Sequence, residues 1–178
     1  MEQWKFKIDP LTGEEVVVKT REYADYQKRV LLQAKLEKAR LPLSILDYDI
    51  SQYIGEDKEG NLPKVKKYIE QFSTKFSKVH LYFYSKDNST QKTTIASFIA
   101  KSLLIKGFTS KFILMSDLVN LLKSEDFKEG SQEEVDALEN CDFLIIDDAF
   151  DVKKMTLYNS GYQLAFIDTF LRKRLEVL

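Results

Sequence analysis

Apolar residues along the second half of the chain alternate between two patterns. Nearly continuous apolar runs, typical of strands buried on both faces, lie within 79–85, 111–115 and 141–148. Apolar residues at helical spacing lie at 94–107, 116–122 and 131–140, and again from about residue 160. Strands that alternate with helices in this way predict an α/β fold, a parallel sheet flanked by helices.

The first part of the chain has a different organisation. A turn signal at 9–13, followed by a short apolar run, predicts an arm or a small hairpin over residues 1–20. Residues 21–40 predict an amphipathic helix, which either packs on its own domain or docks on a partner. We therefore divide the chain into an N-terminal arm and helix, 1–40, and a core, 41–178.

Two further amphipathic helices are expected in the core. The first begins near Pro63 and turns Val65, Tyr68, Ile69 and Phe72 to one side. The second is the last helix of the chain, and its inward-facing residues are expected to be Leu164, Ile167, Phe170, Leu171 and Leu175.

Composition excludes several classes of protein. The 178 residues contain 27 Lys and Arg against 28 Asp and Glu, so the formal net charge is -1 and a uniformly basic nucleic-acid coat protein is excluded. One cysteine and one histidine exclude a disulfide framework and a Cys/His zinc cluster. No apolar run has the length of a membrane span, and no signal-peptide core opens the chain. We expect a cytoplasmic protein.

The loop after the first predicted strand carries the first candidate chemistry. Residues 86–93 read KDNSTQKT, and Lys92-Thr93 opens a helix where a phosphate-binding loop would lie. Such a loop uses backbone N–H groups for phosphate, a lysine for its charge and a hydroxyl for Mg²⁺. Both glycine positions of the pattern hold other residues, so a solvated helix cap is the alternative.

The third predicted strand ends in two acids, Asp147 and Asp148. Four apolar residues run into this pair in FLIIDD, which is typical of a strand whose first acid holds Mg²⁺ and whose second polarises water. The alternative is a pair of acids that caps the loop. Because the carboxyl ends of parallel strands share one edge of the sheet, we expect this pair to lie near Lys92 and Thr93.

From about residue 38 onward the chain resembles the DnaC/DnaI-type replicative helicase loaders, a branch of the AAA+ P-loop ATPases with many phage replication proteins. The resemblance rests on segments in order: KARLPLSILDYDISQY, LYFYSKDNSTQKTTIASFIAKSLLIKG, FILMSDLVNLLK, CDFLIIDDAF and YQLAFIDTFLRKRLE. The IstB-type transposition helpers share much of this layout. FILMSDLVNLL goes beyond generic P-loop patterns and is the most specific of these segments.

The resemblance implies a site for ATP and Mg²⁺. Lys92 would bind the β and γ phosphates, Thr93 and Asp147 would hold Mg²⁺, and Asp148 would be the catalytic acid. Backbone N–H groups for phosphate would come from the segment around Lys92, comprising Asn88, Ser89, Thr90, Gln91 and Thr94. Asn88 is the expected left-handed residue in a loop without glycine.

The chain departs from the family in two further respects. It stops at Leu178, inside the helix after the third strand, so we expect a fragment of a longer product or a shortened relative. The family's fourth strand, which lies between the first and the third, has no counterpart here, and its absence predicts a gap within the sheet. Residues 1–37 contain no Cys or His and cannot form a zinc-bound helicase-docking domain.

Several residues have two possible roles. Arg172, Lys173 and Arg174, joined by Lys153 and Lys154, are either single-stranded DNA contacts or a solvated helix face. Tyr48 and Tyr53 either flank an adenine ring or pack in the core. His80 is expected to be packed within the first strand.

We expect an ATP-binding, helicase-loader-like protein of DNA replication with weak ATPase activity. Its nucleotide state would control binding to a replicative helicase and to single-stranded DNA, and assembly into a homo-oligomer is a further expectation. One alternative is a degenerate P-loop adaptor without ATP turnover, and another is an IstB-like transposition ATPase.

Overall fold

A computed structural model describes residues 2–9, 12–55, 58–85, 90–123, 131–149 and 161–177. The N-terminal elements are β1 (Trp4–Ile8), β2 (Glu15–Lys19) and α1 (Arg21–Lys38), followed by the 3₁₀ turns η1 (Leu43–Ile45) and η2 (Ile50–Gln52). The remaining elements are α2 (Lys58–Glu70), the π-helical turn η3 (Phe72–Phe76), α3 (Lys92–Ile105), β3 (Ser110–Leu114), α4 (Met115–Lys123), α5 (Ser131–Asn140), β4 (Phe143–Asp147) and α7 (Gly161–Val177). The order of elements confirms a mixed α/β fold.

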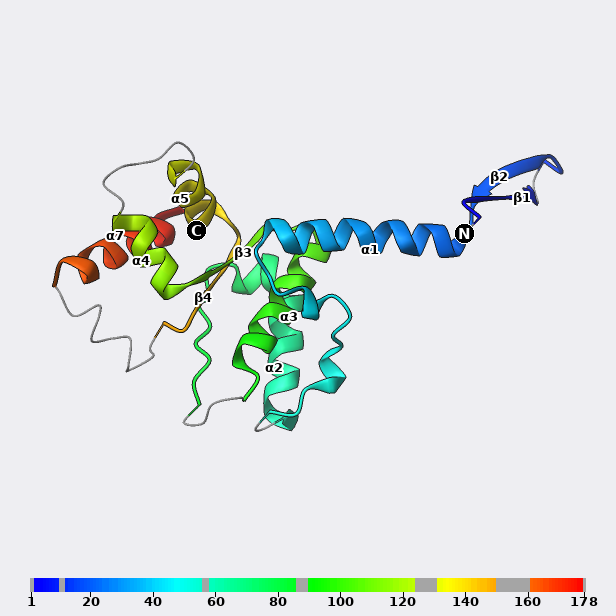
Figure 1. Ribbon diagram of the computed structural model, residues 1–178. Coiled ribbons are helices and arrows are strands. Elements are labelled where there is room, and N and C mark those ends of the chain that lie inside the picture. Colours follow the sequence, from blue (N-terminus) through cyan, green and yellow to red (C-terminus); the bar gives the residue numbers. More distant parts are fainter. Residues whose placement is uncertain are drawn as a thin grey trace.

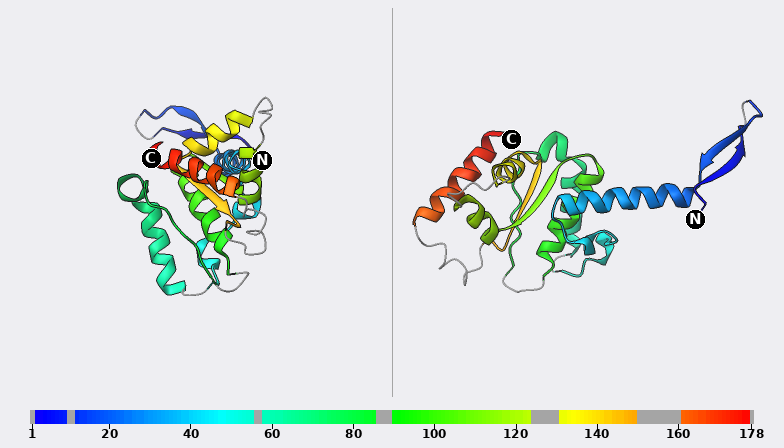
Figure 2. Two further views of the ribbon diagram at one scale, coloured as in Figure 1. Left: turned by 90° about the vertical axis from the view of Figure 1, so that its left-hand side faces the viewer. Right: turned by 45° about the horizontal axis from the view of Figure 1, so that its top comes forward.

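The central sheet contains two parallel strands within the described residues. β3 and β4 pair from Ser110 opposite Phe143 to Leu114 opposite Asp147. Helix α3 lies on one face of this pair, and α4 and α7 lie on the other (Figures 1 and 2). The alternating side chains of each strand therefore enter two different cores. A full P-loop sheet is not established by these strands.

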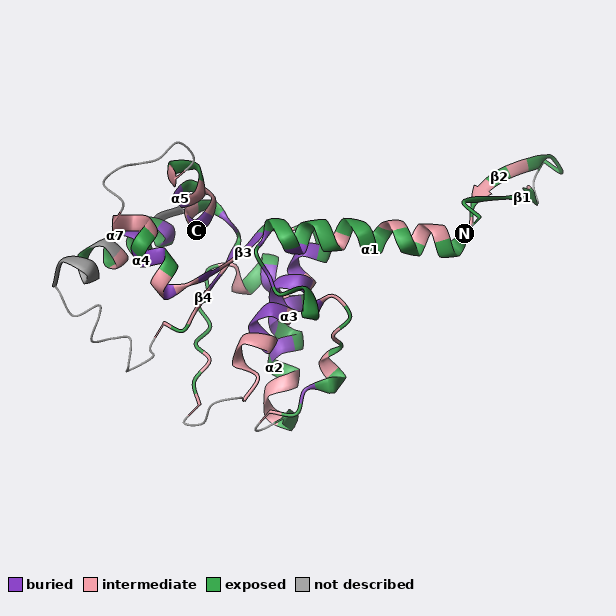
Figure 3. Cartoon of the chain, in the orientation of Figure 1, coloured by how far each residue is buried: buried purple, intermediate pink, exposed green. Residues whose placement is uncertain are grey.

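The two cores account for the uninterrupted apolar character of the strands. On the α3 face, Phe143 and Ile145 join a large cluster built from α1, η1, α2 and α3. On the opposite face, Ile113 joins a cluster with Leu118 and Phe170, from α4 and α7. Figure 3 shows buried residues concentrated in α3 and at the sheet, with α1 mostly exposed. Burial on both faces is what the runs at 111–115 and 141–148 predict.

The predicted first strand is wrong as a sheet strand. Residues 79–85 follow an irregular path beside the sheet and pair with neither β3 nor β4 (Figure 1). Four of their apolar side chains are exposed, by 44% for Val79, 39% for Leu81, 65% for Tyr82 and 69% for Tyr84, whereas Phe83 is half-buried against the larger core. His80 is exposed as well, so its expected packing is also wrong. Strand propensity describes fitness for a paired, half-buried surface, and the described sheet does not supply that pairing here.

Two helix predictions also need correction. Helix α2 begins at Lys58, so Pro63 lies inside the helix and not at its first position. On α7, Phe170 is buried and Ile167 is half-buried, but Leu171 and Leu175 are exposed and do not face the core. The side chain of Leu164 lies outside the described residues.

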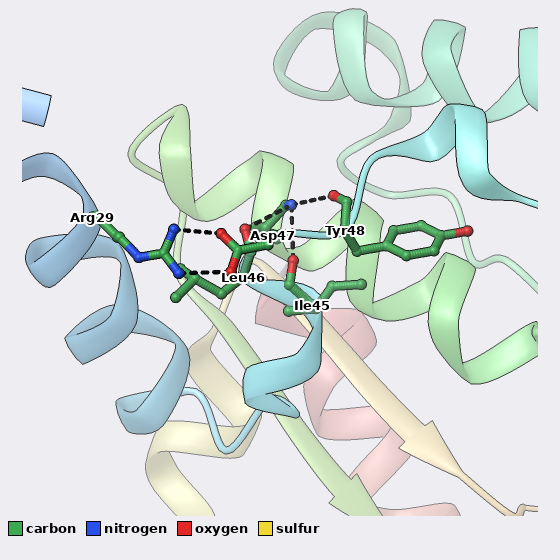
Figure 4. A network of polar contacts seen from close by, with 6 residues as sticks. Arg29, Ile45, Leu46, Asp47 and Tyr48 are labelled. Carbon is green, nitrogen blue, oxygen red and sulfur yellow. Dashed lines mark hydrogen bonds and ion pairs between the residues drawn. The ribbon is translucent and has the colours of Figure 1, made fainter. Parts of the chain in front are cut away.

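A buried lysine ties the segment between α1 and α2 to helix α3. Lys101 Nζ donates to the carbonyl oxygens of Ile45 at 2.8 Å, Tyr48 at 2.6 Å and Leu46 at 3.3 Å (Figure 4). Burial lowers the pKa of Lys101, ahead of the opposing effects of two nearby aspartates. Because one ammonium group of α3 binds three carbonyl oxygens of this segment, the lysine fixes the path of η1 across α3.

The same segment anchors α1. Arg29 forms two hydrogen bonds with Asp47, at 2.5 and 2.6 Å, and this guanidinium lowers the pKa of the Asp47 carboxyl (Figure 4). Lys35 Nζ donates to the carbonyl oxygen of Leu104 at 3.1 Å. The C-terminal half of α1 is thereby fixed on the core.

The N-terminal half of α1 projects from the core and carries the β1–β2 hairpin at its far end (Figures 1 and 2). The hairpin predicted for residues 1–20 is present, with Trp4 opposite Lys19 and Ile8 opposite Glu15. Leu36 is buried near the core end of α1, whereas the outer part exposes Tyr26. The core end of α1 therefore packs on its own domain, as the first interpretation has it, and docking of the exposed end on a partner stays a prediction.

Candidate functional site

The start of α3 and the end of β4 meet as the sequence predicts. Thr93 lies in the first turn of α3, and its Oγ1 donates to Asp147 Oδ2 at 2.8 Å. Both side chains are half-buried. Fifty-four positions separate the two residues, and parallel strand topology brings them together.

This hydroxyl and carboxylate are suited to Mg²⁺. Magnesium takes oxygen ligands and is usually held by one or two carboxylates, with water and substrate phosphates completing an octahedron. Thr93 and Asp147 would supply the protein ligands. Within the described ranges, no group of three or more His, Cys, Asp or Glu side chains forms a self-sufficient metal site, so the remaining ligands would come from water and phosphate.

The left-handed residue of the loop is Gln91. Its φ of 58° and ψ of 26° lie in the αL region, immediately before α3 begins. Gln91 occupies the position that is the second glycine of the P-loop pattern, so the pattern itself held a signal that sequence reasoning missed. Asn88, the expected left-handed residue, and Ser89 lie outside the described residues.

A tertiary contact supports this unusual backbone. Gln91 Oε1 accepts a hydrogen bond at 3.0 Å from the backbone N–H of Ile54. A left-handed conformation costs a non-glycine residue about 1–2 kcal/mol. The contact with Ile54 offsets part of that cost and joins the phosphate-loop candidate to the segment preceding α2.

Lys92 lies beside this turn and lines a cavity. Its Nζ donates to Thr90 Oγ1 at 3.0 Å, and the residue is half-buried. The cavity, of about 320 Å³, is bordered by α2, residues 81–85 and the start of α3. Tyr53 lines it and Tyr48 does not; Tyr48 instead packs edge-on against Phe98. Of the two tyrosines considered for an adenine ring, the structure brings only Tyr53 to this cavity.

Asp148 lies just after β4, and Thr94 lies in the first turn of α3. Asp148 follows β4 directly, is exposed and has a φ of 55°. Its position outside the strand leaves the carboxylate at the same sheet edge as Asp147, where the predicted catalytic acid would lie. Thr94 is half-buried in the first turn of α3, so its backbone N–H belongs to the helix N-terminus.

The basic cluster on α7 is divided: the side chains of Arg172 and Lys173 are exposed, whereas that of Arg174 is buried. Arg174 is 5% exposed and donates to the carbonyl oxygens of Leu138 at 2.8 Å and Glu139 at 3.0 Å. Lys173 pairs with the Glu139 side chain at 3.6 Å, and Arg172 pairs with Asp168 on its own helix. The single-stranded DNA role suggested for Arg174 is therefore wrong: this residue fixes α7 on α5. Lys153 and Lys154 lie outside the described residues.

Comparisons with family models, curated proteins and solved structures find no match to this chain. In the part of the chain that the structure describes, no helix is both long enough and apolar enough to cross a membrane.

Proposed function

We propose that this chain binds a nucleoside triphosphate, ATP in the first instance, together with Mg²⁺ at the edge formed by α3 and β4. The hydrogen bond between Thr93 Oγ1 and Asp147 Oδ2 carries the proposal, because it places a hydroxyl and a carboxylate where one Mg²⁺ would contact both. Lys92 and the N-terminus of α3 add positive charge beside them.

The role that fits this site is that of a helicase-loader-like protein of DNA replication. The resemblance described above supports it, as does the projecting arm, which presents exposed Trp4, Phe6 and Ile8 far from the nucleotide edge. In this proposal the arm docks on a replicative helicase and nucleotide binding controls the contact. Asp148 would polarise the attacking water, and turnover by the isolated chain would be slow.

The experiment is a calorimetric titration of a non-hydrolysable ATP analogue with Mg²⁺ into the folded protein. We expect saturable binding that Lys92→Ala abolishes. Lys106→Ala is the matched control, because Lys106 lies at the far end of the same helix and donates to the carbonyl oxygen of Ile69. Asp147→Asn should leave the protein folded and raise the Mg²⁺ concentration needed for binding. Absence of binding at millimolar analogue by a folded chain would refute the proposal.

One observation favours the second candidate, an adaptor that does not turn over nucleotide. Gln91 holds the left-handed position with a side chain, and that side chain is engaged by Ile54. A loop fixed in this way can support protein contacts without adapting to phosphate. Equal, weak heats of titration for the wild type and Lys92→Ala would support the adaptor over the nucleotide-binding protein.

A further inference from the structure

One face of the β1–β2 hairpin is apolar and exposed. Side chains alternate between the two faces of a strand, so Trp4, Phe6 and Ile8 lie on one face of β1. Val17 of β2 is paired with Phe6 and lies on the same face. The exposed fractions of these four residues range from 51% to 74%. We call Trp4, Phe6, Ile8 and Val17 the arm face.

The arm face is held in place at the far end of α1. Thr20 joins β2 to α1 and caps the helix, because its Oγ1 accepts a hydrogen bond from the N–H of Tyr23 at 3.3 Å. Lys19 Nζ lies 5.6 Å from the centroid of the Trp4 ring and 6.0 Å from that of the Tyr23 ring. The same Nζ donates to Gln27 Oε1 at 2.9 Å. The hairpin is thus braced against α1, and the described part of the core lies at the other end of that helix (Figures 1 and 2).

A hairpin in this position calls for a cover. An isolated two-stranded hairpin is at best marginally stable in water, and an apolar face becomes stabilising only when other elements pack on it. The described residues of the core do not reach the arm face, whose side chains are all more than half exposed. A contiguous exposed apolar face of this kind is typical of a surface that binds another protein molecule.

The charges at the two ends of the arm face are opposite in sign. Lys19 is paired with Trp4 at one end, and Glu15 is paired with Ile8 at the other. If a second hairpin packs face to face with its strands antiparallel, Lys19 of each copy lies opposite Glu15 of the other. Phe6 then meets Phe6 of the second copy at the two-fold axis, and the large Trp4 meets the smaller Ile8. The arm face is therefore complementary to itself in charge and in side-chain size.

The area of the arm face suits a weak dimer. An aromatic side chain presents about 150–250 Å², so the exposed fractions leave about 500 Å² of apolar surface on each arm face. Two such faces would bury about 1,000 Å², which is near the lower bound for a specific interface. We therefore expect a Kd on the order of 10 µM.

We propose that two copies of this chain associate through their arm faces, which pack antiparallel about a two-fold axis. The two hairpins then form a two-layered, four-stranded unit in which the apolar side chains of both copies are covered. This inference goes beyond nucleotide binding and does not depend on it. A helicase that binds the arm would have to separate the two copies, because one arm face cannot serve both partners at once.

The first measurement is sedimentation equilibrium of the full chain without nucleotide, at concentrations below and above the expected Kd. Trp4 is the one tryptophan of the sequence, so its fluorescence reports directly on the arm face. We expect a monomer–dimer equilibrium and, over the same concentrations, a shift of the emission to shorter wavelength. Phe6→Ser should abolish both. Lys5→Glu is the matched control: it lies on the opposite face of β1 and should leave both unchanged.

The second measurement tests the antiparallel arrangement by exchange of charge. Glu15→Lys or Lys19→Glu alone should weaken the dimer about tenfold, because each substitution places two pairs of like charges across the interface. An equal mixture of the two variants should associate within about threefold of the wild-type affinity, because both pairs are then opposite in charge. Restored association would also show that both variants fold.

Three outcomes would overturn the proposal. The first is a wild-type chain that remains monomeric at millimolar concentration. The second is a dimer whose affinity Phe6→Ser leaves unchanged, since its interface would then lie elsewhere. The third is a mixture of the two charge variants that associates no better than either variant alone.

Discussion

Replacing Lys101 with methionine tests what holds the segment between α1 and α2 on the core. Lys101→Met keeps the length and apolar character of the side chain and removes the ammonium group. That group donates to three carbonyl oxygens, of Ile45, Leu46 and Tyr48. The substitution therefore isolates the polar contacts from the packing of the lysine stem.

The expected loss of stability follows from these contacts. The two shorter bonds, at 2.8 and 2.6 Å, are charge-assisted, and each such bond contributes about 1.5–3 kcal/mol. The bond at 3.3 Å adds little. Removing the buried charge relieves its desolvation cost, the same cost that lowers the pKa of Lys101. We expect a net loss of about 3 kcal/mol in the free energy of unfolding, or about 6–12 °C in Tm.

Urea denaturation followed by circular dichroism measures this difference. Lys106→Met is the matched control: it lies on the same helix, is exposed and makes a single bond of 2.8 Å to the carbonyl oxygen of Ile69. It should cost about 0.5–1.5 kcal/mol. If Lys101→Met costs no more than Lys106→Met, the three-carbonyl contact does not stabilise the fold and the reasoning is refuted.

Two other substitutions give sharp outcomes. At Gln91, the alanine variant keeps the left-handed strain and loses the contact with Ile54, so the glycine variant should be the more stable of the two by about 1 kcal/mol in urea denaturation; equal stabilities would contradict a strained backbone at this position. Burial raises the pKa of Tyr68 to about 12. The unfolded chain therefore releases this proton first, and wild-type stability should fall between about pH 10 and pH 12, by up to about 2.7 kcal/mol. Tyr68→Phe should lose the bond to the carbonyl oxygen of Val79 at neutral pH and then show a shallower alkaline decline; parallel declines would contradict the assignment.

Several features followed from the sequence because they depend on local pattern or on general topology. The apolar runs at 111–115 and 141–148 predicted β3 and β4, and both strands are covered on both faces. The meeting of Thr93 and Asp147 was also predictable, since a helix that follows one parallel strand starts at the edge where the other strands end. The turn signal at 9–13 likewise predicted the hairpin.

Other features depended on contacts between distant parts of the chain. Residues 79–85 have the composition of a strand, but a strand exists only with a hydrogen-bonded neighbour, and the described sheet offers none at that position. The pairing of Lys101 with carbonyl groups more than fifty positions away leaves no periodic trace in the sequence. The sequence suggested that Arg174 is a surface charge, because no local sequence pattern shows that its guanidinium contacts α5.

Periodicity and strand direction were thus enough to predict most of the helices, the strands β3 and β4, and the end of the sheet that carries the Lys-Thr and Asp-Asp pairs. The left-handed turn at Gln91, the projection of the arm beyond the core and the cavity beside β4 became visible in the folded chain alone. The physical reason is that backbone hydrogen bonds between strands, buried charges and exposed apolar faces are properties of pairs of segments, and a pair is defined only when the chain has folded.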